Sequence, residues 1–152
     1  MTALARNKAR AEVSDAVLRG FIGYHMKRAF NVLQADLHRV LKPFGLRMVT
    51  YSALALIVEN PGARQGELAD ALAIERPNLV VLLDGLEKAG LIRRDKVPED
   101  RRAYALMPTV KGRGVMVQAT EAIRADEARL LKGLDAKTRQ TVIDVMGRIE
   151  KG

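Results

Sequence analysis

Apolar residues recur at helical spacing along most of the chain, in segments that proline and glycine interrupt. The first segment follows Ser14, a candidate N-cap, and stops at Pro43 and Gly45. Its apolar positions are Leu18, Ile22, Met26, Leu33, Leu37 and Leu41. Two similar segments close the chain after Thr109 and Asp135, with stripes at Met116, Ala119, Ile123 and Leu130, and at Val142, Met146 and Ile149. The pattern therefore predicts long helices at both ends.

Three shorter helices and a hairpin are predicted between these ends. The helices cover residues 54–58, 65–72 and 77–89, and Gly90 is a good terminator for the third. Strand candidates at 91–96 and 103–107 flank the charged turn Val97-Pro98-Glu99-Asp100-Arg101-Arg102. Helix, helix, helix, hairpin is the order of a winged helix-turn-helix. We therefore predict a mainly α fold with a two-stranded β-hairpin wing and long N- and C-terminal helices.

The chain of 152 residues has the length of about one domain. Residues 1–12 alternate small and basic residues without apolar periodicity, which indicates a mobile tail. Residues 13–152 are predicted to form a single domain, in which 46–108 are the winged lobe. The apolar stripes of 13–45 and 109–152 exceed what a domain this small can easily bury alone, so these segments are predicted to dimerise.

The charge balance of the chain indicates what kind of partner it binds. Lysine plus arginine number 26 against 18 aspartate plus glutamate, which gives a net charge of +8 and favours a polyanion such as nucleic acid. Only 4% of residues are aromatic and none is tryptophan, so few rings are present to stack on the bases of a single strand. A nucleic-acid duplex is therefore the favoured partner. The absence of cysteine fits a cytoplasmic protein, and the longest apolar stretch, 51–58, is too short for a membrane span.

The predicted helix 77–89 has two unlike faces. At about 100° per residue, Leu79, Leu82, Leu83 and Leu86 share one side, and Asn78, Val81, Gly85 and Lys88 fall on nearly the opposite side. In a major groove, Asn78 can read adenine or a phosphate, Val81 can contact a thymine methyl, and Gly85 lets the backbone approach. The alternative is that Val81 is half buried and Gly85 is a tolerated defect.

Three arginines are placed to contact phosphates. Arg76 precedes the first turn of this helix, whose free N–H groups and dipole also favour an anion. Arg101 and Arg102 follow Asp100 at the hairpin tip, so the carboxylate can brace one arginine while the other reaches a minor groove or a phosphate. A solvated charge cluster is the plainer interpretation, but the adjoining helix favours DNA.

Catalytic and metal sites are not indicated. His25 and His38 lie about 220° apart around one predicted helix and cannot share a metal within one chain. Gly112-Arg113-Gly114 lacks the third glycine of a dinucleotide-binding loop, and a helix start explains it better. We expect no enzyme activity, no metal and no cofactor.

Several ordered motifs together resemble the MarR family of bacterial transcriptional regulators, over roughly residues 14–150. They are Glu67-Leu68-Ala69, then 86–94 (LEKAGLIRR), Asp100-Arg101-Arg102, and Thr109-Val110-Lys111-Gly112. The resemblance implies a DNA-recognition helix at 77–89, including Pro77, with wing arginines at Arg101 and Arg102. It also implies dimerisation through the first and the last two helices. Pro108, Val81 and Gly85 depart from the residues common in the family.

The same resemblance implies a small effector that releases DNA. The stretch 23–29 (GYHMKRA) is similar to a branch linked to the breakdown of aromatic acids, whose effectors include free acids and their coenzyme A thioesters. Tyr24, His25, Arg28 and Tyr51 are the candidate effector-binding residues, because they add a few polar groups to an apolar stripe. The alternative is that they are ordinary boundary residues with satisfied hydrogen bonds.

Two functions from different classes follow. The first is a ligand-responsive repressor that binds a pseudo-palindromic duplex as a homodimer and is released by an anionic aromatic acid or its coenzyme A thioester. The second is a ligand-binding or protein-interaction module on the same fold with little DNA affinity, which the apolar Val81 and Gly85 could suggest. Binding to the DNA upstream of its own gene separates them.

Overall fold

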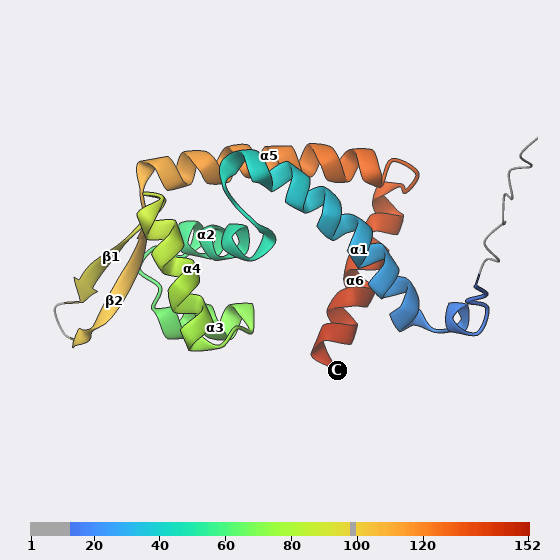
Figure 1. Cartoon of the computed structure of the whole chain (residues 1–152), viewed down its shortest axis with the longest axis horizontal. Helices are drawn as coiled ribbons and strands as arrows, with labels where there is room; N and C mark the ends of the chain where they lie inside the picture. The colour runs from blue at the N-terminus through green and yellow to red at the C-terminus, as the bar shows by residue number, and fades with distance from the viewer. Residues whose placement is uncertain (1–12, 98–99) are drawn as a thin grey trace, which may run out of the picture. The chain divides into compact units, whose positions relative to one another are not determined.

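The computed structural model describes residues 13–97 and 100–152, and of 100–103 it describes the backbone alone. The predicted tail at 1–12 lies outside the described residues. Two compact units divide the chain, one up to Leu33 and one from Gln34 onward, and each is described by itself. In chain order the elements are η1 (Leu18–Gly20), α1 (Ile22–Leu41), η2 (Lys42–Phe44), α2 (Met48–Glu59), α3 (Gln65–Leu72), α4 (Arg76–Lys88), β1 (Ile92–Val97), β2 (Asp100–Pro108), α5 (Val110–Leu130) and α6 (Ala136–Lys151) (Figure 1).

In the first unit the long N-terminal helix starts later than predicted. We expected one helix from Ser14, but a 3-10 turn at Leu18–Gly20 is followed by Phe21 in an extended conformation (φ −111°, ψ 128°). The Arg19 carbonyl oxygen lies 2.9 Å from Nε2 of His25, and the Ser14 hydroxyl accepts the nearby Ala16 N–H. These local side-chain contacts compete with helical hydrogen bonds, so α1 begins at Ile22.

The helices of the winged lobe follow their capping residues closely. α2 starts at Met48, well before the predicted apolar segment, because the Thr50 hydroxyl accepts the Arg47 N–H at 2.8 Å. α3 has the predicted bounds, and Glu67 accepts the Arg64 N–H at 2.8 Å in the same manner. α4 ends before Gly90, whose φ of +73° is the left-handed conformation that suits glycine.

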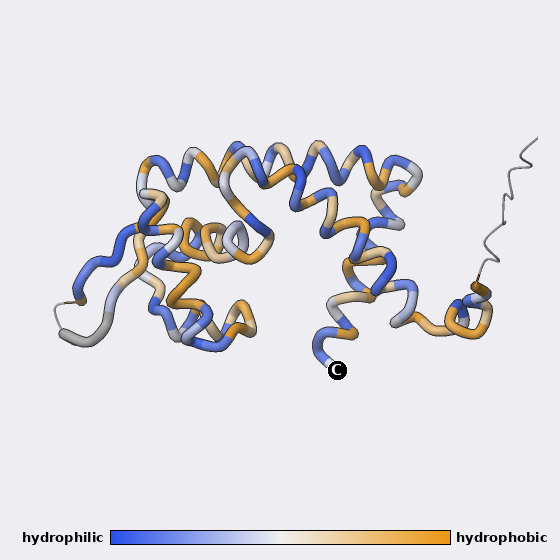
Figure 2. Tube along the Cα trace, in the orientation of Figure 1, coloured by the Kyte–Doolittle hydropathy of each residue, from blue (hydrophilic) through white to orange (hydrophobic). Residues whose placement is uncertain are grey.

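The hydrophobic core is made by α2 to α5 and the hairpin. α2 packs against α4 and α5, and α4 packs against α3 and β1. Figure 2 shows the hydrophobic stretches of α2 in orange, whereas β1 is largely blue. The buried apolar residues are Leu41, Leu46, Ala53, Leu54, Ile57, Leu68, Ala69, Leu79, Leu83, Leu86, Leu91, Ile92, Leu106 and Ala119. The lobe thus has its own core.

The hairpin confirms the predicted wing but shortens its turn. β1 and β2 pair antiparallel, with Ile92 opposite Pro108 and Arg94 opposite Leu106. The register shifts between Lys96 and Val97, and Val97 still pairs with Asp100, so the predicted six-residue turn was too long. Pro108 is buried at the very end of β2, where a missing N–H costs the ladder little.

The motif Thr109-Val110-Lys111-Gly112 joins α5 to the end of α4. The Thr109 hydroxyl oxygen accepts the Gly112 N–H at 2.9 Å and donates to the Gly90 carbonyl at 2.7 Å. A Cβ on Gly112 would lie 1.9 Å from the Leu91 carbonyl oxygen, so only glycine allows this close approach. The motif is therefore a structural junction, as expected for a helix start.

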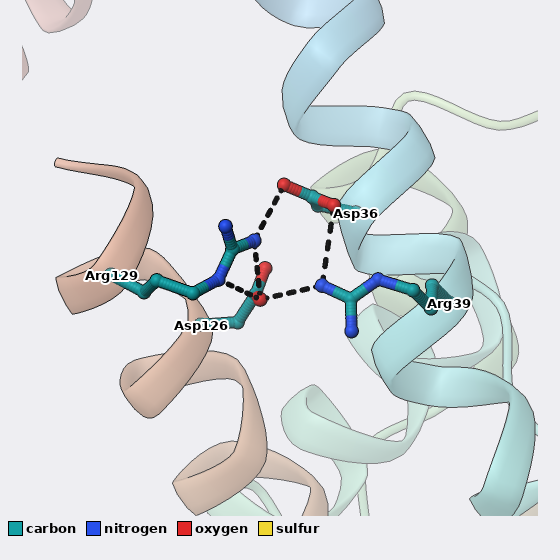
Figure 3. A network of polar contacts seen from close by, with 4 residues as sticks. All are labelled: Asp36, Arg39, Asp126 and Arg129. Atoms are coloured by element: carbon teal, nitrogen blue, oxygen red, sulfur yellow. Dashed lines mark hydrogen bonds and ion pairs between the residues drawn. The ribbon is translucent and has the colours of Figure 1, made fainter.

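Charged side chains connect the second half of α1 to α5. Arg39 Nη2 lies 2.7 Å from Asp126 Oδ1, and Arg129 Nη2 lies 3.0 Å from Asp36 Oδ2 (Figure 3). The hydrogen bond from Arg129 lowers the pKa of Asp126, and Arg39 adds to that effect. These helices are joined by ion pairs at the surface.

α6 completes the chain after Asp135, whose carboxylate accepts the Thr138 N–H at 2.7 Å. No residue of α6 is buried. Within the described ranges, no single helix is long and apolar enough to cross a membrane, and the bent pair Ile22–Phe44 with Met48–Glu59 meets only the criteria of length and composition. The mainly α winged-helix fold is confirmed, while the assignment of 13–152 to one domain with dimerising ends stays a prediction.

Candidate nucleic-acid interface

α4 has the two faces that the sequence predicted. Leu79, Leu83 and Leu86 are buried, and the opposite side is exposed. Val81 is 71% exposed, so the alternative that it is half buried is wrong. Nothing in the described structure lies within 4 Å of a Cβ built on Gly85, so packing does not explain this glycine. We call the exposed side that carries Asn78, Val81, Asp84, Gly85 and Lys88 the outer face of α4.

The prediction from the sequence did not include Asp84 in the outer face. At 100° per residue it falls about 60° from Val81, so the same helical arithmetic could have placed it there. Its side chain is 61% exposed, and Oδ1 lies 2.7 Å from Nη2 of Arg94 on β1. Arg94 also forms an ion pair with Glu87, the other acidic residue of α4. The acidic groups of α4 are therefore both paired with the wing strand.

The start of α4 presents Arg76, Pro77 and Asn78, all exposed. Arg76 is the first residue of the helix, not the residue before it, and Pro77 occupies the first turn as predicted. Glu75 at the N-cap makes no capping hydrogen bond with its side chain, so it does not occupy the first N–H groups of α4. A Cβ on Gly66 would lie 3.7 Å from Arg76 Nη2, which places this guanidinium beside the start of α3.

The wing arginines lie at the limit of what is described. Arg101 and Arg102 belong to β2, but their side chains, like that of Asp100, lie outside the described residues. On β1, Arg93 Nε and Nη2 bind the Asp95 carboxylate at 2.9 Å and 3.0 Å. This exposed pair was also not anticipated. The DNA contacts of the wing stay predictions.

Three of the four predicted effector-binding residues lie together in the first unit. The Arg28 guanidinium carbon is 5.5 Å from the centre of the Tyr24 ring, and the His25 ring meets that ring edge-on at 5.8 Å. Arg28 Nη1 also reaches the Tyr24 hydroxyl at 3.4 Å. Beside them is an open hollow of about 580 Å³ lined by His25, Arg28, Ala29, Asn31 and Val32.

Asp15 is a member of this cluster that the sequence did not reveal. The Tyr24 hydroxyl donates to Asp15 Oδ2 at 2.5 Å, and Arg19 Nε lies 2.8 Å from Oδ1. These two hydrogen bonds, that of Tyr24 first, lower the pKa of the Asp15 carboxyl. The Tyr24 hydroxyl thus already donates its hydrogen bond to an acidic side chain.

The fourth predicted effector-binding residue, Tyr51, belongs to the second unit and contacts α5 there. Its hydroxyl lies 3.0 Å from Thr120 Oγ1. The Thr120 hydroxyl donates to the Met116 carbonyl at 2.7 Å, so Tyr51 is the donor to Thr120. Tyr51 is a partly buried residue with a satisfied hydrogen bond, and its place in an effector pocket stays a prediction.

Comparison with known proteins agrees with this geometry. The sequence profile of the MarR family matches residues 46–104. A protein assigned as the transcriptional regulatory protein for the hcr operon of Thauera aromatica is 29% identical over 144 residues, which are 94% of this chain and 87% of that protein.

Two solved structures of the transcriptional repressor CouR are also similar. CouR bound to a 23-mer DNA duplex has a TM-score of 0.88 and 35% identity, and the match covers 92% of this chain and 99% of that one. CouR bound to p-coumaroyl-CoA has a TM-score of 0.82 and 33% identity, and covers 91% and 98%.

The fold, the exposed outer face of α4 and the adjoining hairpin define a winged helix-turn-helix DNA-binding protein of the kind that regulates transcription. The chain belongs to the MarR family. The expectation that it is not an enzyme is confirmed by this membership, since the family consists of DNA-binding transcription factors.

Proposed function

We propose that this protein is a cytoplasmic, homodimeric transcriptional repressor that binds a pseudo-palindromic DNA duplex and releases it when a small anionic effector binds. The observation that carries the proposal is the outer face of α4, which is exposed and ends in Lys88 while the leucines opposite hold the core. Val81 is exposed on this face and the space around Gly85 is open, so both are accessible to a partner. The similarity to DNA-bound CouR supports the same mode.

In this mode α4 enters the major groove. Asn78 contacts a base edge or a phosphate, Val81 contacts a thymine methyl, and Lys88 contacts a phosphate at the far end. Arg76 binds a phosphate at the helix N-terminus, where N–H groups and the dipole add to its charge. Arg101 and Arg102 reach the neighbouring backbone or minor groove from the wing.

The proposed dimer is formed by the terminal helices. One side of α6 carries exposed apolar residues, and no residue of this helix is buried. A second copy would cover these residues and place two winged lobes on two half-sites about one helical turn, roughly 34 Å, apart. The exposed apolar residues at the two ends include Leu18, Phe21, Ile22 and Leu33, and Val142, Ile143, Val145, Met146 and Ile149.

The proposed effector is an aromatic carboxylate or its coenzyme A thioester. His25 offers a ring and Arg28 a cation to the open hollow, and Tyr24 packs against both, which suits an anionic and largely apolar ligand. CouR bound to p-coumaroyl-CoA supports the thioester form and a role in aromatic catabolism. Release of DNA requires that the effector bind the DNA-free form more tightly, and the coupling must be reciprocal.

Binding to the DNA upstream of its own gene tests the DNA proposal. Wild type should retain a labelled upstream duplex at physiological salt and not a scrambled duplex of equal length. Arg102→Ala should weaken binding to both and reduce the slope of log K against log salt by about 1, since one phosphate contact is lost. Unchanged affinity of the Arg101→Ala, Arg102→Ala double variant at low salt would contradict the wing assignment. Failure of wild type to bind favours the non-DNA-binding module.

The effector assignment has a matched control on the same helix turn. Arg28→Ala should raise the effector concentration that releases half of the bound duplex by roughly tenfold, because a charge-assisted contact is lost, and should leave effector-free binding intact. Lys27→Ala removes a neighbouring cation that lies over Phe30 and should respond as wild type. A normal response of Arg28→Ala rejects this residue. A wild-type complex untouched by aromatic acids and acyl thioesters rejects the effector.

A further inference from the structure

One arginine of the wing holds both acidic side chains of the helix beside it. Arg94 Nη2 lies 2.7 Å from Asp84 Oδ1, Nη1 forms an ion pair with Glu87, and the Arg94 backbone N–H donates to Glu87 Oε1 at 3.2 Å. The Arg94 side chain is only 15% exposed, although its two partners reach the surface. Its guanidinium is therefore directed toward α4 and is not available to DNA.

The geometry of these contacts joins α4 and β1 at one point. Glu87 receives hydrogen bonds from both the backbone and the side chain of Arg94, so it fixes the strand as well as the guanidinium. Arg94 pairs with Leu106 inside the hairpin ladder, so a shift of its backbone moves both strands. A planar guanidinium can bind two carboxylates in fixed directions, and a lysine ammonium cannot.

The same contacts control the charge of the outer face. Asp84 lies at the edge of this face, about 60° from Val81 around the helix, and its side chain is 61% exposed. A carboxylate here repels phosphates when it is free to turn toward them. Its ion pair with Arg94 holds it at the side of the helix that faces the wing.

We propose that Arg94 is a positioning residue for DNA recognition: it sets the wing against α4 so that both engage one duplex, without contacting DNA itself. This inference rests on the proposed DNA-binding function. A change in the angle between helix and wing weakens the contacts that need both elements in register, which are those with a matched site. Non-specific binding depends on total charge and tolerates the change.

The test is the conservative variant Arg94→Lys, with Arg93→Lys as the matched control. Both keep the charge, but among the described side chains Arg93 binds Asp95 of its own strand and none of α4. The probes are a duplex enriched from a random pool by wild type and a scrambled duplex of equal length. Arg94→Lys should lower the ratio of the two affinities by roughly tenfold, since a charge-assisted hydrogen bond is lost, with little change for the scrambled duplex. Arg93→Lys should keep the wild-type ratio.

A second variant keeps the proposal open to refutation if Arg94→Lys folds poorly. Glu87 lies about 120° from Val81 around the helix, so Glu87→Gln weakens the contact with Arg94 without changing a residue of the outer face, and its charge change affects both probes alike. It should lower the same ratio severalfold. A purely structural role of these residues would lower the fraction of folded protein and so weaken binding to both duplexes equally. The ratio of the two affinities is insensitive to that loss. A wild-type ratio in both variants overturns the inference, whereas failure of wild type to enrich any duplex overturns the proposed function itself.

Discussion

The winged lobe and the terminal helices carry the same kind of apolar stripe with opposite results. In the lobe, Leu54, Ile57, Leu79 and Leu83 are essentially inaccessible. In α6 the corresponding apolar positions all remain exposed and no residue is buried. Where α1 meets α5, the described contacts include the ion pairs of Figure 3.

The difference teaches where each part finds its partner. The elements α2 to α5 and the hairpin cover one another, so the lobe folds around leucines supplied by its own sequence. Within the described residues the apolar side of α6 stays exposed, which favours a surface that another molecule covers. This difference supports the proposal that the lobe recognises DNA and that the terminal helices form the dimer.

The largest expected effect comes from breaking assembly alone. Met146→Asp with Ile149→Asp places two charges on the apolar side of α6, which should convert dimers to monomers because charges are costly in an apolar interface. Affinity for a duplex with two half-sites should fall by roughly 10²- to 10⁴-fold, as the second lobe is no longer tethered. Light scattering and duplex binding measure the two effects.

Lys137→Asp is the control for that experiment. It changes the net charge by the same amount near the start of α6, at an exposed position away from the apolar side. It should remain dimeric. A dimer that survives Met146→Asp and Ile149→Asp with unchanged duplex affinity would show that assembly does not use α6.

Two neighbouring positions of α4 separate stability from recognition inside the lobe. Leu83→Ala removes a fully buried side chain and should lower the free energy of unfolding by about 2–5 kcal/mol. Val81→Ala removes a side chain that is 71% exposed and should change stability by less than about 0.5 kcal/mol. Its binding to the matched duplex should nevertheless weaken by about 1–2 kcal/mol if Val81 buries its two methyl groups against a thymine methyl.

Urea titration and duplex binding on the same preparations check this pair. A stable Leu83→Ala would contradict the description of the core. A Val81→Ala variant that binds the matched and scrambled duplexes as wild type does would remove Val81 from the interface and leave the phosphate contacts.

The smallest effect concerns the charged network of α1 and α5. The pKa of Asp126 is lowered below its ordinary value of 3.8 by Arg129 and Arg39, so the folded state holds its proton less tightly than the unfolded state. The contribution of the Asp126 carboxylate to the free energy of unfolding is therefore complete above pH 3.8, and it is lost as the pH falls below this value. The thermal midpoint of wild type should exceed that of Asp126→Asn at neutral pH, and the gap should close in acid.

Added salt should narrow the same gap at neutral pH, because exposed pairs are screened. Asp70→Asn, which removes an exposed carboxyl of α3, is the control. A gap that persists unchanged down to pH 2 would mean that Asp126 acts by packing.

The sequence predicted the fold because its signals are local. Periodicity located the helices, and Thr109, Asp135 and Gly90 marked their ends through capping and a positive φ. The predicted start of α1 was wrong because the local contact between His25 and the Arg19 carbonyl competes with helical hydrogen bonds, and apolar spacing does not encode such a contact.

The site was only partly predictable for a related reason. The two faces of α4 follow from helical geometry, and Asp84 was within reach of the same arithmetic. Its pairing with Arg94, and that of Tyr24 with Asp15, join different elements and depend on how the backbone places them. A pattern along one helix cannot reveal such partners.

The measurement that tests this division of labour most directly is affinity as a function of half-site spacing. In the proposed dimer the terminal helices hold two lobes at a fixed distance, so both half-sites must lie on the same side of the duplex. Inserting five base pairs turns one half-site about half a helical turn away. We predict that this insertion abolishes tight binding, while inserting ten restores part of it and each half-site alone binds weakly. Equal affinity for the original and the five-base-pair insertion would contradict the account, because the lobes would then bind without a rigid dimer.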